Sequence, residues 1–309
     1  IWDSEIYISE FTIQNGVGTY YDLNDQDDYF YLGGGILCAT SIDIHGSTDF
    51  YQDYGIGMTF DNLIIRDNGD YYGYSNGIFV KHYNANFTNT IIEDNKGASF
   101  YLQSSKSRFE NVIIQNNYVA AGIAAQSHAS FHNCIFTNNN TSSLSYVGGV
   151  TITYSSGPTF INTTFVNNLS NPNLEDGAGA IRTSNGGSFN LINSIVWGNS
   201  SPDYPNIYID NDGEYESISY IMYSDIEGGV DNVVSQGTGD MTLNWLEGNI
   251  EEDPLFEDIT SDLNLQSLSH CIDAGTTDLD GIEGFPWGGN YNDITEFNGY
   301  GPDMGALES

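Results

Sequence analysis

A nine-residue pattern that occurs five times in the middle of this chain limits its fold more than any other feature. The pattern is Phe-x-Asn-x-x-φ-x-x-Asn, in which φ is apolar, and its copies begin at Phe60, Phe87, Phe109, Phe131 and Phe160. Successive copies start 22 to 29 residues apart, and weaker copies lie on both sides of the five. A sequence period of this length is typical of solenoids, in which each repeat stacks on the one before it.

Between the copies lie further short apolar runs, such as Gly77-Ile-Phe-Val80 and Gly149-Val-Thr-Ile152. Each repeat therefore holds two or three short strands, with Asn and Gly at the bends. No stretch keeps the periodicity of an amphipathic helix. Strands without helices at this period predict an all-β fold, a right-handed parallel β-helix solenoid in which each repeat is one coil and coils stack about 4.8 Å apart.

The residue types at the repeated positions fit this fold. Each Phe would stack on the Phe of the next coil, and the two Asn columns would form ladders at the bends, since Asn tolerates left-handed backbone geometry. Strict alternation turns the position two residues after the first Asn toward solvent, and there four copies carry isoleucine: Ile64, Ile91, Ile113 and Ile135. We expect either an outer apolar interface, covered by a partner or a long insert, or a change of alternation that turns these residues into the core.

The pattern ends before the chain does. We expect residues 1–229 to form the β-helix, with an acidic, tyrosine-rich insert near residues 17–32. After Gly229 neither the Phe nor the Asn column continues. Because the ends of solenoids are usually covered, residues 230–309 are predicted to be a C-terminal capping segment that closes the last coil.

The insert near residues 17–32 is the candidate metal site. It alternates acidic and amide side chains, whose oxygens suit Ca²⁺, and the ligands would be Asp22, Asn24, Asp25, Asp27 and Asp28. The spacing is not that of an EF-hand, so a solvated acidic loop is the alternative. Tyrosines in this third of the chain could stack on sugars or simply cover the coil surface, among them Tyr20, Tyr21 and Tyr72.

The charge of the chain narrows the set of partners. It holds 6 Lys and Arg against 42 Asp and Glu, which gives a net charge of -36. Nucleic acids and anionic membranes would be repelled, and polyanionic sugars are disfavoured as substrates. No apolar run is long enough to span a membrane, so we expect no transmembrane segment.

Basic side chains gather on two adjacent coils. Lys106 and Arg108 lie at the start of the third copy, and His128 lies one coil later in the place that matches Lys106. Glu110 and His132 match each other in the same way. All five should face outward, where they could serve general acid–base chemistry or pair as charges across strands. We prefer charge pairing, so Lys106, Arg108 and His128 form the site of the alternative, enzymatic hypothesis.

Several Asn-x-Ser/Thr sequences match the acceptor pattern for N-glycosylation. Those at Asn86, Asn140 and Asn199 are the candidate glycosylation sites. Because the chain is rich in Asn, Ser and Thr, chance explains most such matches.

Several short motifs are specific enough to suggest a family. They are Gly34-Gly35-Ile36-Leu37, Phe136-Thr-Asn-Asn139, Phe165-Val-Asn-Asn168, Asp253-Pro-Leu-Phe256, Cys271-Ile-Asp-Ala-Gly275 and Asp303-Met-Gly-Ala306. With them the chain resembles secreted bacterial right-handed β-helix proteins of the pectin-lyase-like type and the repeats of polymorphic outer-membrane proteins. Their C-terminal segments usually carry Pro before the Cys, where His270 stands here. The resemblance implies the fold but no single activity, because this fold serves lyases, hydrolases, adhesins and fibre proteins.

From these features we expect a non-enzymatic structural protein that is extracellular or at the cell surface. It would act as an adhesin stalk or as a subunit that stacks end to end into a filament, since the motif sets of the family's lyases and hydrolases are incomplete here. The alternative is a carbohydrate-active enzyme, a polysaccharide lyase or glycoside hydrolase, that uses the basic patch. A third hypothesis is a glycan-binding module that uses the tyrosines.

Overall fold

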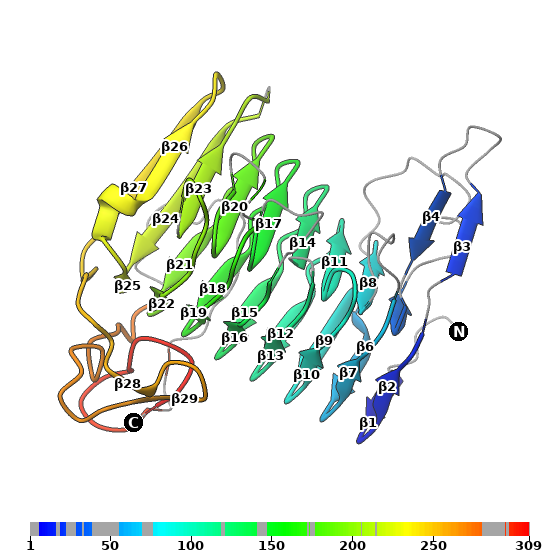
Figure 1. Cartoon of the computed structure of the whole chain (residues 1–309), viewed down its shortest axis with the longest axis horizontal. Coiled ribbons are helices and arrows are strands. Elements are labelled where there is room, and N and C mark those ends of the chain that lie inside the picture. Colours follow the sequence, from blue (N-terminus) through cyan, green and yellow to red (C-terminus); the bar gives the residue numbers. More distant parts are fainter. Residues whose placement is uncertain are drawn as a thin grey trace.

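A computed structural model of the whole chain shows an elongated stack of strands (Figure 1). The structure describes residues 6–16, 19–22, 29–32, 34–38, 56–69, 77–118, 121–140, 147–171, 173, 177–204, 206–213, 215–279, 294 and 297–308. In these ranges the chain winds through three long sheets, and every pairing within them is parallel. The predicted parallel β-helix is therefore confirmed.

Each repeat gives one strand to each sheet. The first sheet contains, in spatial order, β1 (Ile6–Ser9), β6 (Ile56–Asp61), β9 (Asn84–Thr88), β12 (Arg108–Glu110), β15 (Ser130–His132), β18 (Thr159–Ile161), β21 (Asn190–Ile192), β24 (Ser217–Met222) and β27 (Met241–Trp245). The second contains β2 (Thr12–Gln14), β7 (Ile64–Arg66), β10 (Ile91–Glu93), β13 (Ile113–Gln115), β16 (Ile135–Thr137), β19 (Thr164–Val166), β22 (Ile195–Trp197) and β25 (Asp225–Ile226). The third contains β5 (Ile36–Cys38), β8 (Ile78–Lys81), β11 (Phe100–Gln103), β14 (Ala121–Ala124), β17 (Val150–Thr153), β20 (Ile181–Ser184), β23 (Ile207–Asp210) and β26 (Val233–Gln236).

Two antiparallel pairs lie outside these sheets. They are the hairpin of β3 (Thr19–Asp22) with β4 (Tyr29–Leu32), and β28 (Phe256–Asp258) with β29 (Asp262–Leu265). A short 3-10 helix spans Gly229–Asn232. In the described ranges no helix is long and apolar enough to cross a membrane.

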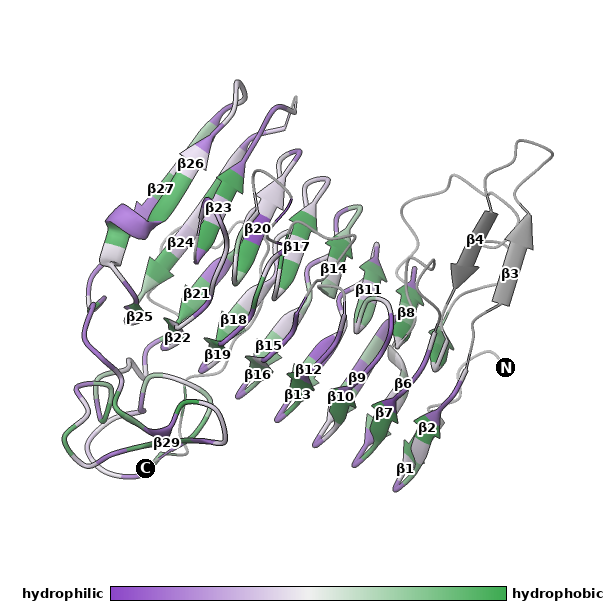
Figure 2. Ribbon diagram, viewed as in Figure 1, coloured by the Kyte–Doolittle hydropathy of each residue, from purple (hydrophilic) through white to green (hydrophobic). Residues whose placement is uncertain are grey.

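Aromatic rings form the centre of the core, as predicted. The Phe that opens each copy is buried, and successive rings stack with centroids 4.7 to 4.9 Å apart: Phe60, Phe87, Phe109, Phe131 and Phe160. This separation matches the strand spacing of about 4.8 Å, so the stack follows directly from the sequence period. Figure 2 shows apolar residues along the strands and hydrophilic residues at the turns between them.

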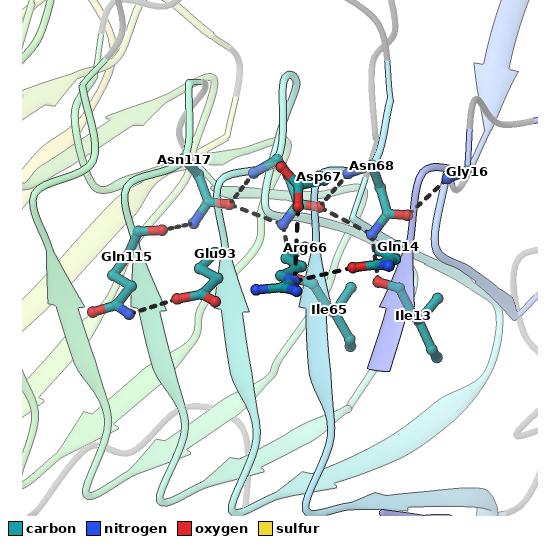
Figure 3. A network of polar contacts seen from close by, with 11 residues as sticks. Ile13, Gln14, Gly16, Ile65, Arg66, Asp67, Asn68, Glu93, Gln115 and Asn117 are labelled. Carbon is teal, nitrogen blue, oxygen red and sulfur yellow. Dashed lines mark hydrogen bonds and ion pairs between the residues drawn. The ribbon is translucent and has the colours of Figure 1, made fainter. Parts of the chain in front are cut away.

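The two Asn columns take different roles at the bends. The first Asn of each copy adopts a left-handed geometry with φ between 47° and 54°, which ends the strand. The second Asn is buried and forms a ladder of six rungs: Asn68, Asn95, Asn117, Asn139, Asn168 and Asn199. Each of the first five rungs donates from Nδ2 to the Oδ1 of the next over 2.9 to 3.1 Å, and all six donate to a backbone carbonyl of the preceding coil. Figure 3 shows the start of this ladder, from Gly16 to Asn117.

The alternation predicted for each copy also holds. The outer face of the second sheet carries a column of half-buried isoleucines: Ile64, Ile91 and Ile113. The next residue of each strand is buried in the core, so the hypothesis that the alternation changes at the bend is wrong. The outer column continues through Ile135, which is buried, to Thr164 and Ile195.

The C-terminal boundary differs from the predicted one. β26 and β27 continue the third and first sheets to Trp245, past residue 229, because pairing and inward alternation persist after the Asn pattern is lost. The following segment then packs on the outer face of the second sheet, in a cluster of Val166, Ile195, Phe256, Leu265, Cys271 and Met304. The Ala306 N–H donates to Thr164 Oγ1 at 3.0 Å. The described residues of the C-terminal segment that follow Ile250 thus lie against a side of the solenoid (Figure 1).

In the five copies that carry the full pattern, most of the length difference between repeats lies at one corner of the coil. In the five copies that carry the full pattern, two residues always connect the first sheet to the second. The connection from the second sheet to the third varies, from 5 residues between β13 and β14 to 14 between β19 and β20. The variable corner lies just after the buried Asn of each copy, so the ladder is unaffected by the length of the loop.

Candidate functional site

The predicted basic patch lies on the outer face of the first sheet. Lys106 and Arg108 come from β12 and the bend before it, and His128 and His132 come from β15 and its bend, one coil later. The strand residues face outward because they alternate with the buried Phe column. Glu110 and His132 are direct partners across the two strands, as the sequence register predicts.

The ion pair of the patch lies within one strand rather than between coils. Arg108 Nη2 lies 3.1 Å from Glu110 Oε2, and these side chains are 52% and 39% exposed. Arg108 and Glu110 are two residues apart on one strand, so their side chains lie on the same face and can form an ion pair there. An exposed pair of this kind contributes only about 0–1 kcal/mol to stability.

Both histidines of the patch are weak bases at neutral pH. Burial, and next the positive charge of Arg108, lowers the pKa of His132 to about 4. Burial also lowers the pKa of His128, where a backbone hydrogen bond to Gly157 acts in the opposite direction and Lys106 lowers the pKa further. A general base works best when its pKa is near the operating pH. The patch therefore offers two cations and neutral imidazoles, an arrangement better suited to binding an anionic group than to taking a proton.

The candidate Ca²⁺ ligands fall mostly outside the described residues. Asp22 is the last residue of β3, directly opposite Tyr29 of β4 in the hairpin. The other four lie beyond the described ranges: Asn24, Asp25, Asp27 and Asp28. Within the part of the chain that the structure describes, no group of three or more His, Cys, Asp or Glu is arranged to hold a metal ion. Of the candidate sugar-binding tyrosines, Tyr20 and Tyr21 lie on β3, and Tyr72 is outside the described ranges.

The three glycosylation candidates occupy different environments. Asn86 is half-buried on the outer face of β9, opposite Arg108. Asn140 is exposed where it forms a bridge with Leu169. Asn199 is the buried last rung of the Asn ladder and donates from Nδ2 to the carbonyl of Phe165 at 2.9 Å. The amide of Asn199 therefore serves the fold, and Asn140 is the most accessible of the three.

A buried acidic group escaped the sequence analysis. Asp225 takes the outward position of the isoleucine column in the last repeat and is fully buried. Its Oδ2 accepts from the Cys271 thiol at 3.2 Å and its Oδ1 accepts from the Glu252 N–H at 3.2 Å. Burial raises the pKa of Asp225 to about 7. The sequence signal for this group is an Asp at a position where other repeats carry isoleucine. Its hydrogen-bond partners could not be predicted, because they lie in a segment without repeats.

The three long parallel sheets define the class of protein as a parallel β-helix solenoid. The sequence matches the family described as the right handed beta helix region, over residues 3–165 and 50–228. The chain belongs to this right-handed β-helix family.

Comparisons with individual proteins add less. Among curated proteins no sequence matches this chain. One solved structure to which the chain is similar is the crystal structure of pectate lyase Pel9A, with 12% identity, a TM-score of 0.42, and coverage of 97% of this chain and 86% of that chain. At this identity and TM-score the likeness carries no argument about function.

Proposed function

We propose that this chain is a non-enzymatic structural protein of the extracellular space or cell surface. It acts as a stiff rod, either as an adhesin stalk or as a subunit that stacks end to end into a filament. The observation that supports this proposal is the unbroken Asn ladder from Asn68 to Asn199, which joins six consecutive coils by the same buried hydrogen bonds.

The ladder supports a mechanical role because two coils cannot separate at this corner without breaking its hydrogen bonds. Each rung after Asn68 accepts two hydrogen bonds at Oδ1, from the backbone N–H and the Nδ2 of the rung before it. An unpaired buried polar group costs about 1–3 kcal/mol, so separating two coils at this corner carries a penalty beyond loss of strand pairing. The Phe stack adds close ring contacts along the same axis.

The basic patch favours a second candidate, a carbohydrate-active enzyme. Lys106, Arg108 and His128 lie together on an outer face of an otherwise strongly acidic chain, where they could bind a weakly charged glycan. Two features support the structural proposal over this one. Arg108 is already paired with Glu110, and the nearby histidines are weak bases.

A degradation screen separates the two candidates. The purified chain is incubated with neutral and weakly charged polysaccharides, and new reducing ends and unsaturated products are measured. The structural proposal expects no cleavage. Cleavage that is lost in Lys106→Ala and His128→Ala, and kept in Lys96→Ala, would replace it with the enzymatic one; Lys96 is an exposed lysine away from the patch.

Two further properties are part of the proposal. Ca²⁺ would bind the Asp22 to Asp28 loop, and glycans could be bound by the tyrosines beside it. Isothermal titration with Ca²⁺ and with soluble oligosaccharides tests both, with Asp25→Asn/Asp27→Asn and Tyr20→Ala/Tyr21→Ala as the variants expected to lose binding. If the heat of binding is the same in these variants as in the unaltered chain, the loop and its tyrosines are not the binding site.

A further inference from the structure

The two ends of the first sheet are edge strands. In the described residues β1 pairs with β6 alone and β27 pairs with β24 alone, so each has one side without a neighbouring strand. The outer edge of such a strand presents backbone N–H and C=O groups that can pair with another chain.

Core-facing side chains at both ends lack the cover that they have elsewhere. Phe11 takes the same inward column as Leu63, because its carbonyl accepts from the Ile64 N–H just as that of Leu63 accepts from Ile91. Leu63 is 1% exposed, whereas Phe11 is 62% exposed. Ile8 is the β1 member of the Phe column, since it pairs with Phe60, and it is also only half-buried.

The opposite end has the same character. Three residues of β27 face inward, in register with buried residues of β24, and all three are only partly buried: Met241, Leu243 and Trp245. Their partners in β24 are 1% exposed or less: Ser217, Ser219 and Ile221. Both ends of the solenoid therefore leave apolar surface that belongs to a continued core.

Neither edge strand carries the usual protection against pairing. Natural edge strands are commonly blocked by charged residues or proline. Ile6-Tyr-Ile-Ser9 and Met241-Thr-Leu-Asn-Trp245 contain neither, in a chain with 42 acidic and 6 basic residues. Acidic residues adjoin these two strands, at Glu10 and Asp240, but none lies within them.

We infer that β27 of one copy pairs in parallel with β1 of a second copy, so that the first sheet runs on from copy to copy. The register follows from the columns, since Trp245 aligns with Ile221 and Ile8 with Phe60. Trp245 then packs on Ile8 and continues the Phe column across the joint. Phe11 becomes buried against the turn after β27. This inference rests on the proposed structural function and names its partner as a second copy of the chain.

Two physical consequences of this joint are measurable. The contact uses different surfaces on the two copies, so it does not close and produces filaments. The described residues of one copy contribute nine strands to the first sheet, which gives an axial repeat of about 43 Å at about 4.8 Å per strand. Because each copy has a net charge of -36, salt should favour assembly by screening the repulsion between copies.

The test uses one variant at each end with a matched control. Leu243→Lys places a charge on the inward side of β27, and Thr242→Lys places the same charge on its exposed outward side. Phe11→Lys and Thr12→Lys, both at exposed positions, form the pair for the other end. Oligomeric state is measured by sedimentation velocity at low and high salt, and circular dichroism checks that every variant folds.

The inferred joint predicts that the chain and both outward variants form filaments, that each inward variant alone is monomeric, and that a mixture of the two inward variants forms heterodimers only. The heterodimer arises because each inward variant keeps one intact end. Homodimers of a single inward variant, assembly unaffected by Leu243→Lys, or a chain that stays monomeric at high salt and high concentration would overturn the joint. These outcomes would still be compatible with a monomeric stalk, so they would overturn the joint alone. Cleavage of a glycan would instead overturn the proposed structural function.

Discussion

Asn117 illustrates how much of the fold depends on single amides. Its Oδ1 accepts from the backbone and the side chain of Asn95, and its Nδ2 donates to Asn139 Oδ1 and to the Ile92 carbonyl. All of these groups are buried. A side chain in this column therefore satisfies three coils at once.

We predict that Asn117→Ala destabilises the chain by about 2–6 kcal/mol, because two buried polar groups lose their partners at about 1–3 kcal/mol each. The measurement is urea unfolding followed by circular dichroism. Gln115→Ala is the control, since this partly exposed residue on the same coil makes one side-chain bond to Glu93 at 2.8 Å. Equal losses in the two variants would contradict a special role for the ladder.

Asp225 makes stability depend on pH. Its pKa is raised to about 7 in the folded chain, mainly by burial, so the folded state favours the protonated form. The groups around it provide no positive charge: Cys271 and the backbone of Glu252 donate to it, and the carboxylates of Glu252 and Asp253 raise its pKa further. The stability from this proton is fully present below about 3.9, the usual pKa of an unfolded Asp, and is lost as pH rises through about 7.

We predict that Asp225→Asn is more stable than the unaltered chain above pH 7 and that the difference shrinks as pH falls toward 4. Asn keeps an oxygen for the Glu252 N–H and carries no charge to bury. Urea unfolding across this pH range measures the effect, and Asp231→Asn, at an exposed position, should show no such trend. A constant difference at all pH values would show that the carboxyl does not titrate as stated.

At the scale of elements, the C-terminal segment is held to the solenoid by a compact apolar cluster. Met304 is 1% exposed within it, and its N–H donates to the Cys271 carbonyl at 2.9 Å. The next residues cross the outer isoleucine column, where Gly305 lies so close to Ile195 that a Cβ would fall 2.9 Å from its Cδ1. The segment is therefore fitted to this face of the second sheet.

We predict that Met304→Asp weakens docking of the segment by about 2–4 kcal/mol, because it removes apolar contacts and buries a carboxylate. Limited proteolysis should then release the C-terminal segment while the solenoid resists. Leu268→Asp is the matched control, because Leu268 is 81% exposed. Release at the same rate in both variants would argue that the cluster does not hold the segment.

The repeats could be predicted from sequence, and the segment could not, for a physical reason. In a repeated column such as Phe60 to Phe160, the sequence period alone identifies which residues are in contact, since each Phe packs on its counterpart in the next coil. The outward patch was placed correctly by the same register, although its ion pair lies within a strand. The contact between Ala306 and Thr164 joins residues 142 apart with no repeat to relate them, so only the folded chain reveals it.

At the scale of the whole molecule, charge is the dominant property. A net charge of -36 spread over a rod raises the free energy of the folded state by repulsion, and mobile ions reduce that repulsion. We predict that the melting temperature rises with NaCl concentration. A melting temperature that falls with salt would show that attractive ion pairs outweigh the repulsion. A larger rise with CaCl₂ than with MgCl₂ at equal ionic strength would indicate a selective Ca²⁺ site.

The variable corner after each buried Asn has a consequence for how such a chain can change. Connections of 5 to 14 residues between the second and third sheets begin there, one per coil, at an Asn column whose hydrogen bonds are the same in successive repeats. The starting points of successive connections therefore follow one another along the rod at a spacing of about 4.8 Å. Substitutions and insertions in these connections leave the Asn ladder and the core unchanged. The solenoid can therefore act as a scaffold on which a binding surface changes independently of folding.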